Sequence, residues 1–407
     1  MKRAFDSSRR QLILATGASL APMALMGRIG SAAAAPRAQA GLYPSYNGNP
    51  LAPDSTGMTS TAAQLARRIR LGWNIGNTME AIGGETAWGN PLVTGDLIKF
   101  VKASGFNSIR IPCSWDQHAD KATAKISEAW LNRVKQVVQY CIDADMPVLL
   151  NIHWDGGWLD GHINAADAES VVAKQRAFWE QIATHMRDFD ERLMFASANE
   201  PPADKVEQMP ILFRYHQTFI DTVRSTGGKN AYRVLVLQGP STDIDKTYAT
   251  WDHMPRDTVA DRLMVEVHYY TPSQFTLLNE DASWGKMFYF WGKDNHSVAH
   301  PERNPTWGEE KTVDEAMAKM KSKFTDKGIP VILGEFDAMH RGNLSGDDLR
   351  LNQASRASYL RYVTRQALAN GLLPFYWDAG GGVIDRKKLA ILDRQGMDAL
   401  LEGAGKK

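Results

Sequence analysis

The chain has 407 residues, of which 43% are hydrophobic and 23% are charged, a composition typical of a globular protein with a large core. Its 47 basic and 46 acidic residues leave a formal net charge of +1. This balance gives no electrostatic reason to expect nucleic acid or an anionic membrane as a partner, and a neutral ligand fits better.

Residues 1–35 have the features of an export signal. Arg9 and Arg10 precede an apolar run, and small residues suited to cleavage follow in SAAAAPRAQA. This order predicts a twin-arginine signal, with an ordinary secretory signal or an N-terminal anchor as alternatives. The apolar run is too short for a stable membrane span. We therefore expect a periplasmic or secreted protein without stable membrane association.

Residues 36–60 are rich in Pro, Gly, Asn and Ser, which indicates an extended lead-in without a core of its own. Residues 61–407 then form one predicted catalytic domain. The chain has two cysteines, Cys113 and Cys141. Cargo of the twin-arginine route is exported folded, so we expect both thiols to be reduced and to serve packing, with a bridge as the alternative.

From residue 71 onward, short apolar runs alternate with helix-like segments that end at Gly, Asn or Pro. In SEAWLNRVKQVVQYC, for example, Trp130, Val134, Val138 and Cys141 share one helical face. Nearly continuous apolar runs are typical of parallel strands that are covered on both faces. Eight such strands are predicted, at residues 71–75, 107–112, 147–153, 193–199, 233–239, 263–269, 330–336 and 373–379.

Eight strand–helix repeats predict an α/β protein built as a closed (β/α)8 TIM barrel, with an open doubly wound sheet as the alternative. The helix pattern is weak only after residue 239. No glycine-rich phosphate-binding fingerprint follows the first strand, which favours the barrel over the open sheet.

Polar and aromatic side chains stand at the ends of seven of the eight predicted strands. In an α/β barrel, the carboxyl ends of the strands form the active-site face. Pro201 and Pro202 reinforce this placement, because proline cannot continue a central strand. The residues at these ends are Asn74, Arg110, His153, Trp154, Asn199, Glu200, His268, Tyr270, Glu335 and Trp377.

Two of these residues, Glu200 and Glu335, form a pair of carboxylates. Glycoside hydrolysis uses one protonated carboxyl group and one ionised carboxylate. The protonated group donates a proton, and the ionised one attacks the anomeric carbon or activates water. The alternative is a structural ion pair at the rim, with Arg110 as the partner. Trp377 offers a flat apolar face that suits the C–H side of a sugar ring.

A metal site is a further alternative, because His153, Asp155 and His268 are potential ligands on the same rim. No third histidine has a convincing placement, and the chain lacks a GxSxG nucleophile elbow. We therefore expect neither a metal nor a cofactor.

A long insertion follows the sixth strand, roughly at residues 269–310. Long loops of this kind are functional or disordered, and this one is too aromatic for disorder. We expect some of its rings to form a small core of their own and others to line a sugar-binding groove. The rings are those of Tyr269, Tyr270, Phe275, Trp284, Phe288, Tyr289, Phe290, Trp291 and Trp307.

Seven stretches at these strand ends carry a family resemblance. GWNIGNT, GFNSIRIP, NIHWDGG, ANEPP, VHYYTP, ILGEF and FYWDAG occur in this order, and together they resemble glycoside hydrolase family 5 over residues 64–402. Within that family the chain most resembles the bacterial endo-β-1,4-glucanases, or cellulases. The resemblance implies a retaining hydrolase that acts on β-glucan without a cofactor, and we expect it to be a monomer.

The resemblance also implies roles for single residues. Glu200 matches the general acid/base and Glu335 the nucleophile. The remaining matches are Asn199 to a group that binds the sugar 2-hydroxyl, Arg110 and Tyr270 to groups that orient the nucleophile, His153 and His268 to rim histidines, and Trp377 to a sugar platform. Trp154 departs from the frequent HHD pattern of the family, which changes the sugar contacts expected there. Mannanases, xyloglucanases and licheninases share these motifs, and a non-catalytic glycan-binding barrel is a further alternative.

Overall fold

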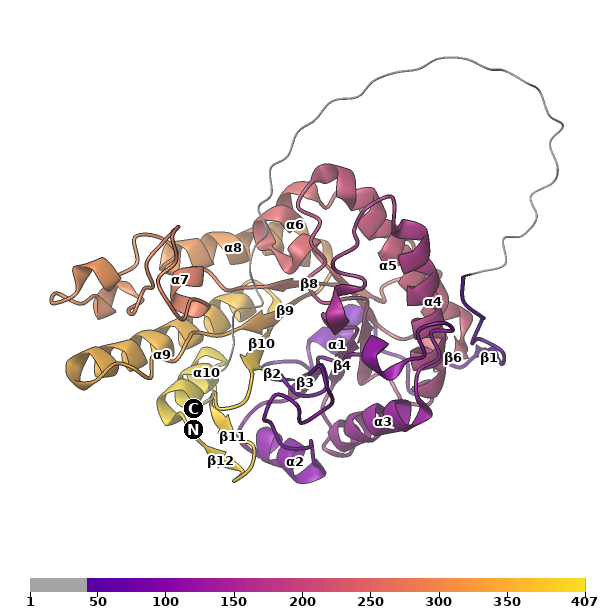
Figure 1. Cartoon of the computed structure of the whole chain (residues 1–407), viewed down its shortest axis with the longest axis horizontal. Coiled ribbons are helices and arrows are strands. Elements are labelled where there is room, and N and C mark those ends of the chain that lie inside the picture. The colour runs from indigo at the N-terminus through magenta and orange to yellow at the C-terminus, as the bar shows by residue number, and fades with distance from the viewer. Residues whose placement is uncertain (1–41, 407) are drawn as a thin grey trace, which may run out of the picture. The chain divides into compact units, whose positions relative to one another are not determined.

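Eight parallel strands close into a barrel in a computed structural model that describes residues 42–406 (Figure 1). Neighbouring strands pair in the order β10-β2-β3-β4-β5-β7-β8-β9. Each strand overlaps the stretch predicted for it, so the (β/α)8 barrel is confirmed and the open sheet is wrong. The strands are β2 (Gly72–Ile75), β3 (Ser108–Ile111), β4 (Val148–Asn151), β5 (Leu193–Ala196), β7 (Leu235–Gln238), β8 (Leu263–His268), β9 (Val331–Phe336) and β10 (Leu372–Asp378).

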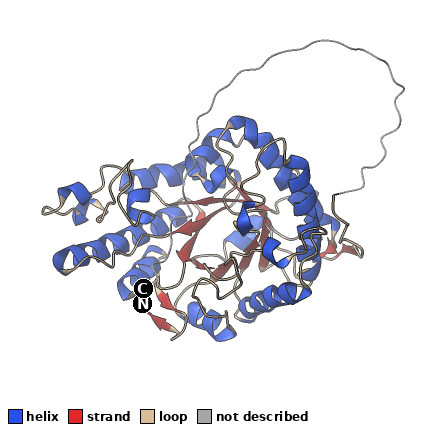
Figure 2. Ribbon diagram, in the orientation of Figure 1, coloured by secondary structure: helices blue, strands red, loops and turns tan. Residues whose placement is uncertain are grey.

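Helices surround the strands on their outer side (Figure 2). Helix α3 shows why the helices pack against the strands. The residues predicted to share one face are buried, while the other faces of the helix are polar. The helix predicted to be weak, α6, has only seven residues. The outer helices are α2 (Gly95–Ala103), α3 (Glu128–Asp143), α4 (Ala168–His185), α5 (Met209–Ser225), α6 (Ile244–Thr250), α8 (Glu310–Lys323), α9 (Gly346–Ala369) and α10 (Arg394–Gly403).

A separate apolar core fills the inside of the barrel. The short helix α1 (Ala62–Ala66) contributes Leu65 to this core, together with interior side chains such as Met264 and Leu373. Those two residues are the second residues of β8 and β10, so α1 closes the end of the barrel at which the strands begin. The opposite, carboxyl-terminal end is therefore the one left for polar side chains.

The described part of the lead-in packs on the barrel domain. The Tyr46 N–H and the Ser45 hydroxyl both donate to Oε2 of Glu180 on α4. Farther on, β1 (Leu51–Pro53) pairs in parallel with β6 (Gly227–Gly228) after α5. Residues 42–60 thus belong to the same compact unit as the barrel. At the other end of the chain, β11 (Ile384–Asp385) and β12 (Ala390–Ile391) form a small antiparallel pair.

The insertion after β8 is held together by its own aromatic residues. It contains the short helix α7 (Ser273–Thr276), and Arg341 donates hydrogen bonds to the carbonyl groups of Gln274 in α7 and of Phe288. Five of its rings are buried, as expected for a small core: those of Tyr269, Phe275, Phe288, Phe290 and Trp291. Trp284 and Trp307 are 62% and 48% exposed, so they are the rings that face solvent.

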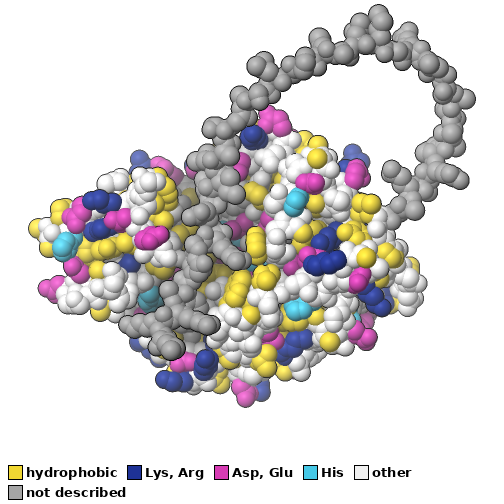
Figure 3. Space-filling view, in the orientation of Figure 1, with side chains coloured by type: hydrophobic (Ala, Val, Ile, Leu, Met, Phe, Trp, Pro, Cys, Tyr) yellow, Lys and Arg dark blue, Asp and Glu magenta, His cyan; other side chains and the backbone are white. Residues whose placement is uncertain are grey.

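The surface carries positive and negative side chains interspersed on the face seen in Figure 3, in keeping with the small net charge. Within residues 42–406, no helix is both long and apolar enough to cross a bilayer. Cys113 and Cys141 are buried and unbridged, which confirms the prediction of reduced packing thiols. The predicted export signal at residues 1–35 lies outside the described residues.

Candidate active site

Arg110 on β3 connects side chains from several strand ends. Its fully buried guanidinium forms ion pairs through Nε with Oε1 of Glu266 at 2.8 Å and through Nη1 with Oε1 of Glu335 at 3.0 Å. Nη1 and Nη2 donate to Oδ1 of Asn74 and of Asn199, each at 3.0 Å. Burial alone would lower the pKa of Arg110, but the two carboxylates raise it. The charged arginine therefore holds these four side chains together at the base of the site.

Glu335, near the end of β9, is fully buried and held from two sides. Arg110 contacts Oε1, and the Tyr270 hydroxyl donates to Oε2 at 3.0 Å. Opposite charge and hydrogen bonds from neighbours both favour an ionised carboxylate. This is the environment that a carboxylate nucleophile requires.

Glu200 has a more open environment. It follows β5 by four residues, and its side chain is 28% exposed. Oε1 lies 2.8 Å from Nδ1 of His268, and the Glu200 N–H donates to Oδ2 of Asp160 at 3.2 Å. The carboxyl group is thus oriented by a histidine on one side while the other side remains accessible to a ligand.

The two glutamates face each other across the site. One carboxylate oxygen of Glu200, one of Glu335 and a ring nitrogen of His268 all lie within 4.8 Å of one another. Carboxyl groups about 5–5.5 Å apart are typical of retaining glycosidases, whereas about 6.5–9.5 Å leaves room for the water of inverting enzymes. Carboxylate oxygens no more than 4.8 Å apart agree with the shorter spacing, that of the retaining class, and not with the longer one.

Two aromatic rings at the carboxyl ends of β4 and β10 stack on each other. The His153 ring lies parallel to the indole of Trp377, with centroids 5.8 Å apart, and Asn151 contacts Nδ1 of His153 at 3.2 Å. Trp154 follows His153 in the chain and is 41% exposed. The predicted residues thus fall into a connected charged cluster and an aromatic pair, with Trp154 as a solvent-facing ring beside them.

A family comparison agrees with this geometry. The family model described as cellulase (glycosyl hydrolase family 5) matches residues 74–382. The chain belongs to glycoside hydrolase family 5.

Known family 5 enzymes resemble the chain over most of its length. It is 37% identical to the xyloglucan-specific endo-β-1,4-glucanase BoGH5A of Bacteroides ovatus over 81% of this chain and 67% of that protein. It is 35% identical to endoglucanase A of Paenibacillus barcinonensis over 79% and 83%, respectively. A solved Bacteroides ovatus family 5 xyloglucanase in complex with a XXXG heptasaccharide superposes with a TM-score of 0.83 at 34% identity, over 90% of this chain and 81% of that one.

Sequence reasoning missed two acids in this family 5 site. Glu266 is fully buried in β8, and Asp160 reaches the backbone of Glu200 from the loop after β4. A signal for Glu266 was available, because alternate residues of a strand share a face and Glu266 precedes His268 by two positions. Asp160 had no such signal, since it lies in an irregular loop. Burial, followed by the nearby charge of Glu200, raises the pKa of Asp160 to about 8.

The three residues named as potential metal ligands, His153, Asp155 and His268, do not come together as one site. Asp155 uses its carboxylate elsewhere, accepting hydrogen bonds from the Asp116 N–H and from Nε1 of Trp158. Among the described acidic, histidine and cysteine side chains, the group close enough to share an ion consists of Glu200, His268 and Glu335. These are the side chains that the glycosidase arrangement already explains.

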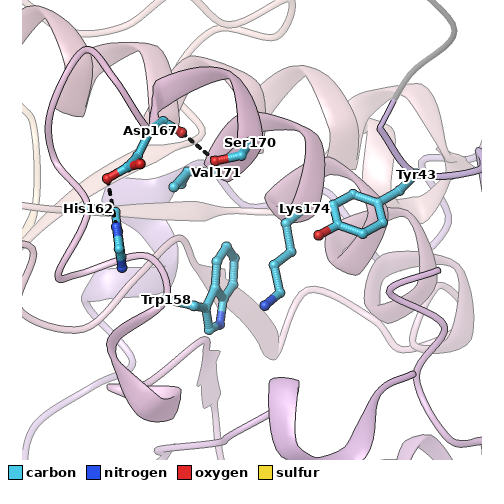
Figure 4. A pocket seen from close by; sticks show the side chains of 7 residues that line it. All are labelled: Tyr43, Trp158, His162, Asp167, Ser170, Val171 and Lys174. Atoms are coloured by element: carbon cyan, nitrogen blue, oxygen red, sulfur yellow. Dashed lines mark hydrogen bonds and ion pairs between the residues drawn. The ribbon is translucent and has the colours of Figure 1, made fainter. Parts of the chain in front are cut away.

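A separate hollow of about 220 Å³ lies beside α4 (Figure 4). The Lys174 ammonium lies over the Trp158 ring, 4.9 Å from its centroid, and also pairs with Asp116. The indole face that would stack on a ligand is therefore already covered. The lining residues are Tyr43, Trp158, His162, Asp167, Ser170, Val171 and Lys174, and none of them belongs to the active-site cluster.

Proposed function

We propose that this family 5 enzyme is a retaining endo-β-1,4-glucanase that hydrolyses internal bonds of cellulose-type or mixed-linkage glucans. The observation that carries the proposal is the close approach of Glu200 and Glu335 in two different environments. Glu335 is buried against Arg110 and Tyr270, whereas Glu200 is partly exposed beside His268.

In the first step, the ionised Glu335 attacks the anomeric carbon, and Glu200 donates its proton to the oxygen of the departing chain. The glycosidic C–O bond breaks, and a covalent bond forms between the sugar and Glu335. The Tyr270 hydroxyl donates a hydrogen bond to the nucleophile, and Asn199 accepts one from Arg110. Trp377 supports the apolar face of the sugar.

In the second step, the deprotonated Glu200 takes a proton from water, and the water oxygen attacks the same anomeric carbon. The bond to Glu335 breaks, and its carboxylate is regenerated. Two displacements leave the product with the original β configuration. NMR spectroscopy of the first products should therefore detect the β-anomer before mutarotation.

Xyloglucan, a β-1,4-glucan with side branches, is a second candidate substrate. The similarity to the xyloglucan-specific enzyme of Bacteroides ovatus and to the xyloglucanase solved with a XXXG heptasaccharide favours it. Xyloglucan has the same β-1,4-linked glucan backbone as cellulose, so the two candidate substrates differ in their branches and not in the bond that is cleaved.

Release of reducing sugar from four polysaccharides would test the proposal. Carboxymethylcellulose, mixed-linkage glucan, xyloglucan and mannan should be compared at equal enzyme concentration. We expect hydrolysis of the glucans and little of mannan. Xyloglucan cleaved far faster than the unbranched glucans would favour the second candidate. Preference for mannan would contradict both, and no release from any of the four would indicate a non-catalytic glycan-binding barrel.

Export from the cytoplasm is part of the proposal. Arg9 and Arg10 precede an apolar run and small residues, as in twin-arginine signals. Replacement of both arginines by lysine should retain the protein in the cytoplasm of a bacterial host, and cell fractionation would measure this. Unchanged export would contradict the twin-arginine route.

A further inference from the structure

Glu266 is a third carboxylate in the cluster around Arg110 and His268. It is fully buried in β8. Oε1 contacts Nε of Arg110 at 2.8 Å and Nε2 of His268 at 3.2 Å, and Oε2 accepts from Nε2 of Gln238 at 2.6 Å. We propose that Glu266 is a positioning residue that keeps His268 protonated on both ring nitrogens. The catalytic proton of Glu200 then occupies the carboxyl oxygen that faces the substrate. This inference rests on the proposed function.

The surroundings of Glu266 require an ionised, acceptor-only carboxylate. Oε1 of Gln238 accepts from the Ser197 hydroxyl at 2.8 Å and from the Ala198 N–H at 2.9 Å. The amide group of Gln238 must therefore present its NH₂ to Glu266. Arg110 adds a positive charge, with Nε 2.8 Å from Oε1. Burial alone would raise the pKa of Glu266, but Arg110, His268 and Gln238 together lower it.

An ionised Glu266 dictates where His268 carries its hydrogens. Nε2 lies 3.2 Å from an oxygen of Glu266 that has no hydrogen to donate, and 3.5 Å from Nη2 of Arg110, which can only donate. The shorter contact, with the carboxylate, favours a hydrogen on Nε2. Nδ1 faces Oε1 of Glu200 at 2.8 Å. With a hydrogen on Nδ1 as well, Oε1 of Glu200 is an acceptor and the catalytic proton must lie on Oε2. Without it, that proton would sit between Oε1 and Nδ1, turned away from the substrate.

The charges around His268 support the doubly protonated ring. Burial alone would lower the pKa of His268, but the charges and hydrogen bonds of Glu335, Glu200 and Glu266 raise it to about 9. Opposing these acids is the Arg110 guanidinium, whose Nη2 lies 3.5 Å from Nε2 of the ring. The titratable groups that contact the ring or act on it electrostatically are Arg110, Asp160, Glu200, Glu266 and Glu335, and Tyr270 contacts the last of these.

Glu266→Gln is the first variant to test, because it removes the charge and keeps the shape. The His268 ring should be followed by ¹⁵N NMR between pH 5 and 10, with His268→Gln used to assign its signals. We expect the titration midpoint of His268 to fall by about 1 pH unit or more, the shift typical of losing one close opposite charge. The alkaline pH at which kcat/KM declines should fall by the same amount as the titration midpoint of His268.

Glu266→Gln alone places two amide NH₂ groups against each other, which would disturb folding as well as charge. The double variant Glu266→Gln/Gln238→Glu is the matched control. It keeps every hydrogen bond described here, since the new carboxylate at position 238 would accept from Ser197, from Ala198 and from the new amide at position 266. The negative charge, however, leaves its contact with Arg110 and His268. We expect the double variant to regain stability and to keep a lowered His268 midpoint.

Two results would overturn the proposal. One is a folded Glu266→Gln variant whose His268 midpoint equals that of the wild type. The other is a double variant that regains both the wild-type midpoint and the wild-type pH profile, since hydrogen bonding rather than charge would then explain Glu266. The NMR titration needs no substrate. A lowered midpoint in a protein that cleaves no glucan would therefore refute the proposed function, while the charge coupling between Glu266 and His268 would still stand.

Discussion

The imidazole of His153 and the indole of Trp377 lie parallel to within 9°, with their ring centroids 5.8 Å apart. The two rings come from the ends of β4 and β10, so they join distant parts of the barrel rim. An offset pair of this kind holds the larger ring in a fixed orientation. Trp377 is thereby presented as a rigid flat surface at the same end of the barrel as the proposed catalytic glutamates.

Replacing Trp377 by Ala removes this surface. We expect kcat/KM on soluble glucans to fall about tenfold or more, because a stacked aromatic contact contributes roughly 0.5–1.5 kcal/mol beyond its buried area and 1.4 kcal/mol corresponds to a factor of ten. Trp377→Phe retains a ring and should lose less. Steady-state kinetics of both variants would check this, and wild-type kcat/KM for Trp377→Ala would contradict the role of a sugar platform.

Asp160 makes folding stability depend on pH in a specific direction. Its pKa is raised by burial to about 8, against about 3.9 for an aspartate in an unfolded chain. The protonated Asp160 therefore makes its full contribution to the free energy of unfolding below pH 4. This contribution is lost progressively as the pH rises toward 8. Asp160→Asn cannot ionise, so its stability relative to the wild type should increase across that interval by about 1.4 kcal/mol per pH unit.

Urea unfolding at several pH values between 4.5 and 8 would measure this trend. Asp281→Asn is a suitable control, because hydrogen bonds from Arg303 and from the Met287 N–H lower the pKa of Asp281 to about 2. Its stabilising effect is present above about pH 4, so the difference between Asp281→Asn and the wild type should stay constant over the range tested. A constant difference for Asp160→Asn would show that the folded protein carries an ionised Asp160.

The fold could be predicted because the same signal repeats eight times. Each buried strand reads as an apolar run, and Gly, Asn or Pro ends the preceding helix, so an error in one element leaves the others intact. The strand ends could be predicted for a related reason, since parallel strands bring their carboxyl ends to one face. Glu200 and Glu335 were found in this way although 135 residues separate them.

The parts of the site that could not be predicted from the sequence depend on distances between side chains and on the paths of loops. Glu266 stands within an apolar run, and its partnership with Arg110 appears only when β3 and β8 face each other across the barrel. Asp160 reaches Glu200 through an irregular loop. In the insertion, Trp284 and Trp291 are both aromatic, and only the packing distinguishes the exposed ring from the buried one.

Removal of divalent ions should leave the enzyme active. Proton transfer by Glu200 and attack by Glu335 need no ion, although with His268 these side chains lie close enough to bind one. Exhaustive treatment with EDTA followed by dialysis should therefore preserve kcat on soluble glucan. A large loss of activity that zinc or another divalent ion restores would instead indicate that this cluster is a catalytic metal site.

The roles of the two glutamates can be separated by replacing each with Gln. Both variants should nearly abolish hydrolysis of glucan chains, because each removes one member of the pair. An aryl cellobioside with a good leaving group scarcely needs an acid. On this substrate Glu200→Gln should still form the glycosyl-enzyme and then stall, since no base activates water. Mass spectrometry of the stalled protein should detect the added disaccharide.

Azide should then distinguish the two variants by stereochemistry. It is a nucleophile that needs no base, so in Glu200→Gln it should attack the glycosyl-enzyme and give the β-glycosyl azide, the retained product. Glu335→Gln lacks the nucleophile and cannot form the covalent intermediate. Any azide product of that variant would arise from a single displacement and would be the inverted α-azide. NMR spectroscopy of the two products would identify the anomers, and a β-azide from the Glu335 variant would show that the two roles are assigned the wrong way round.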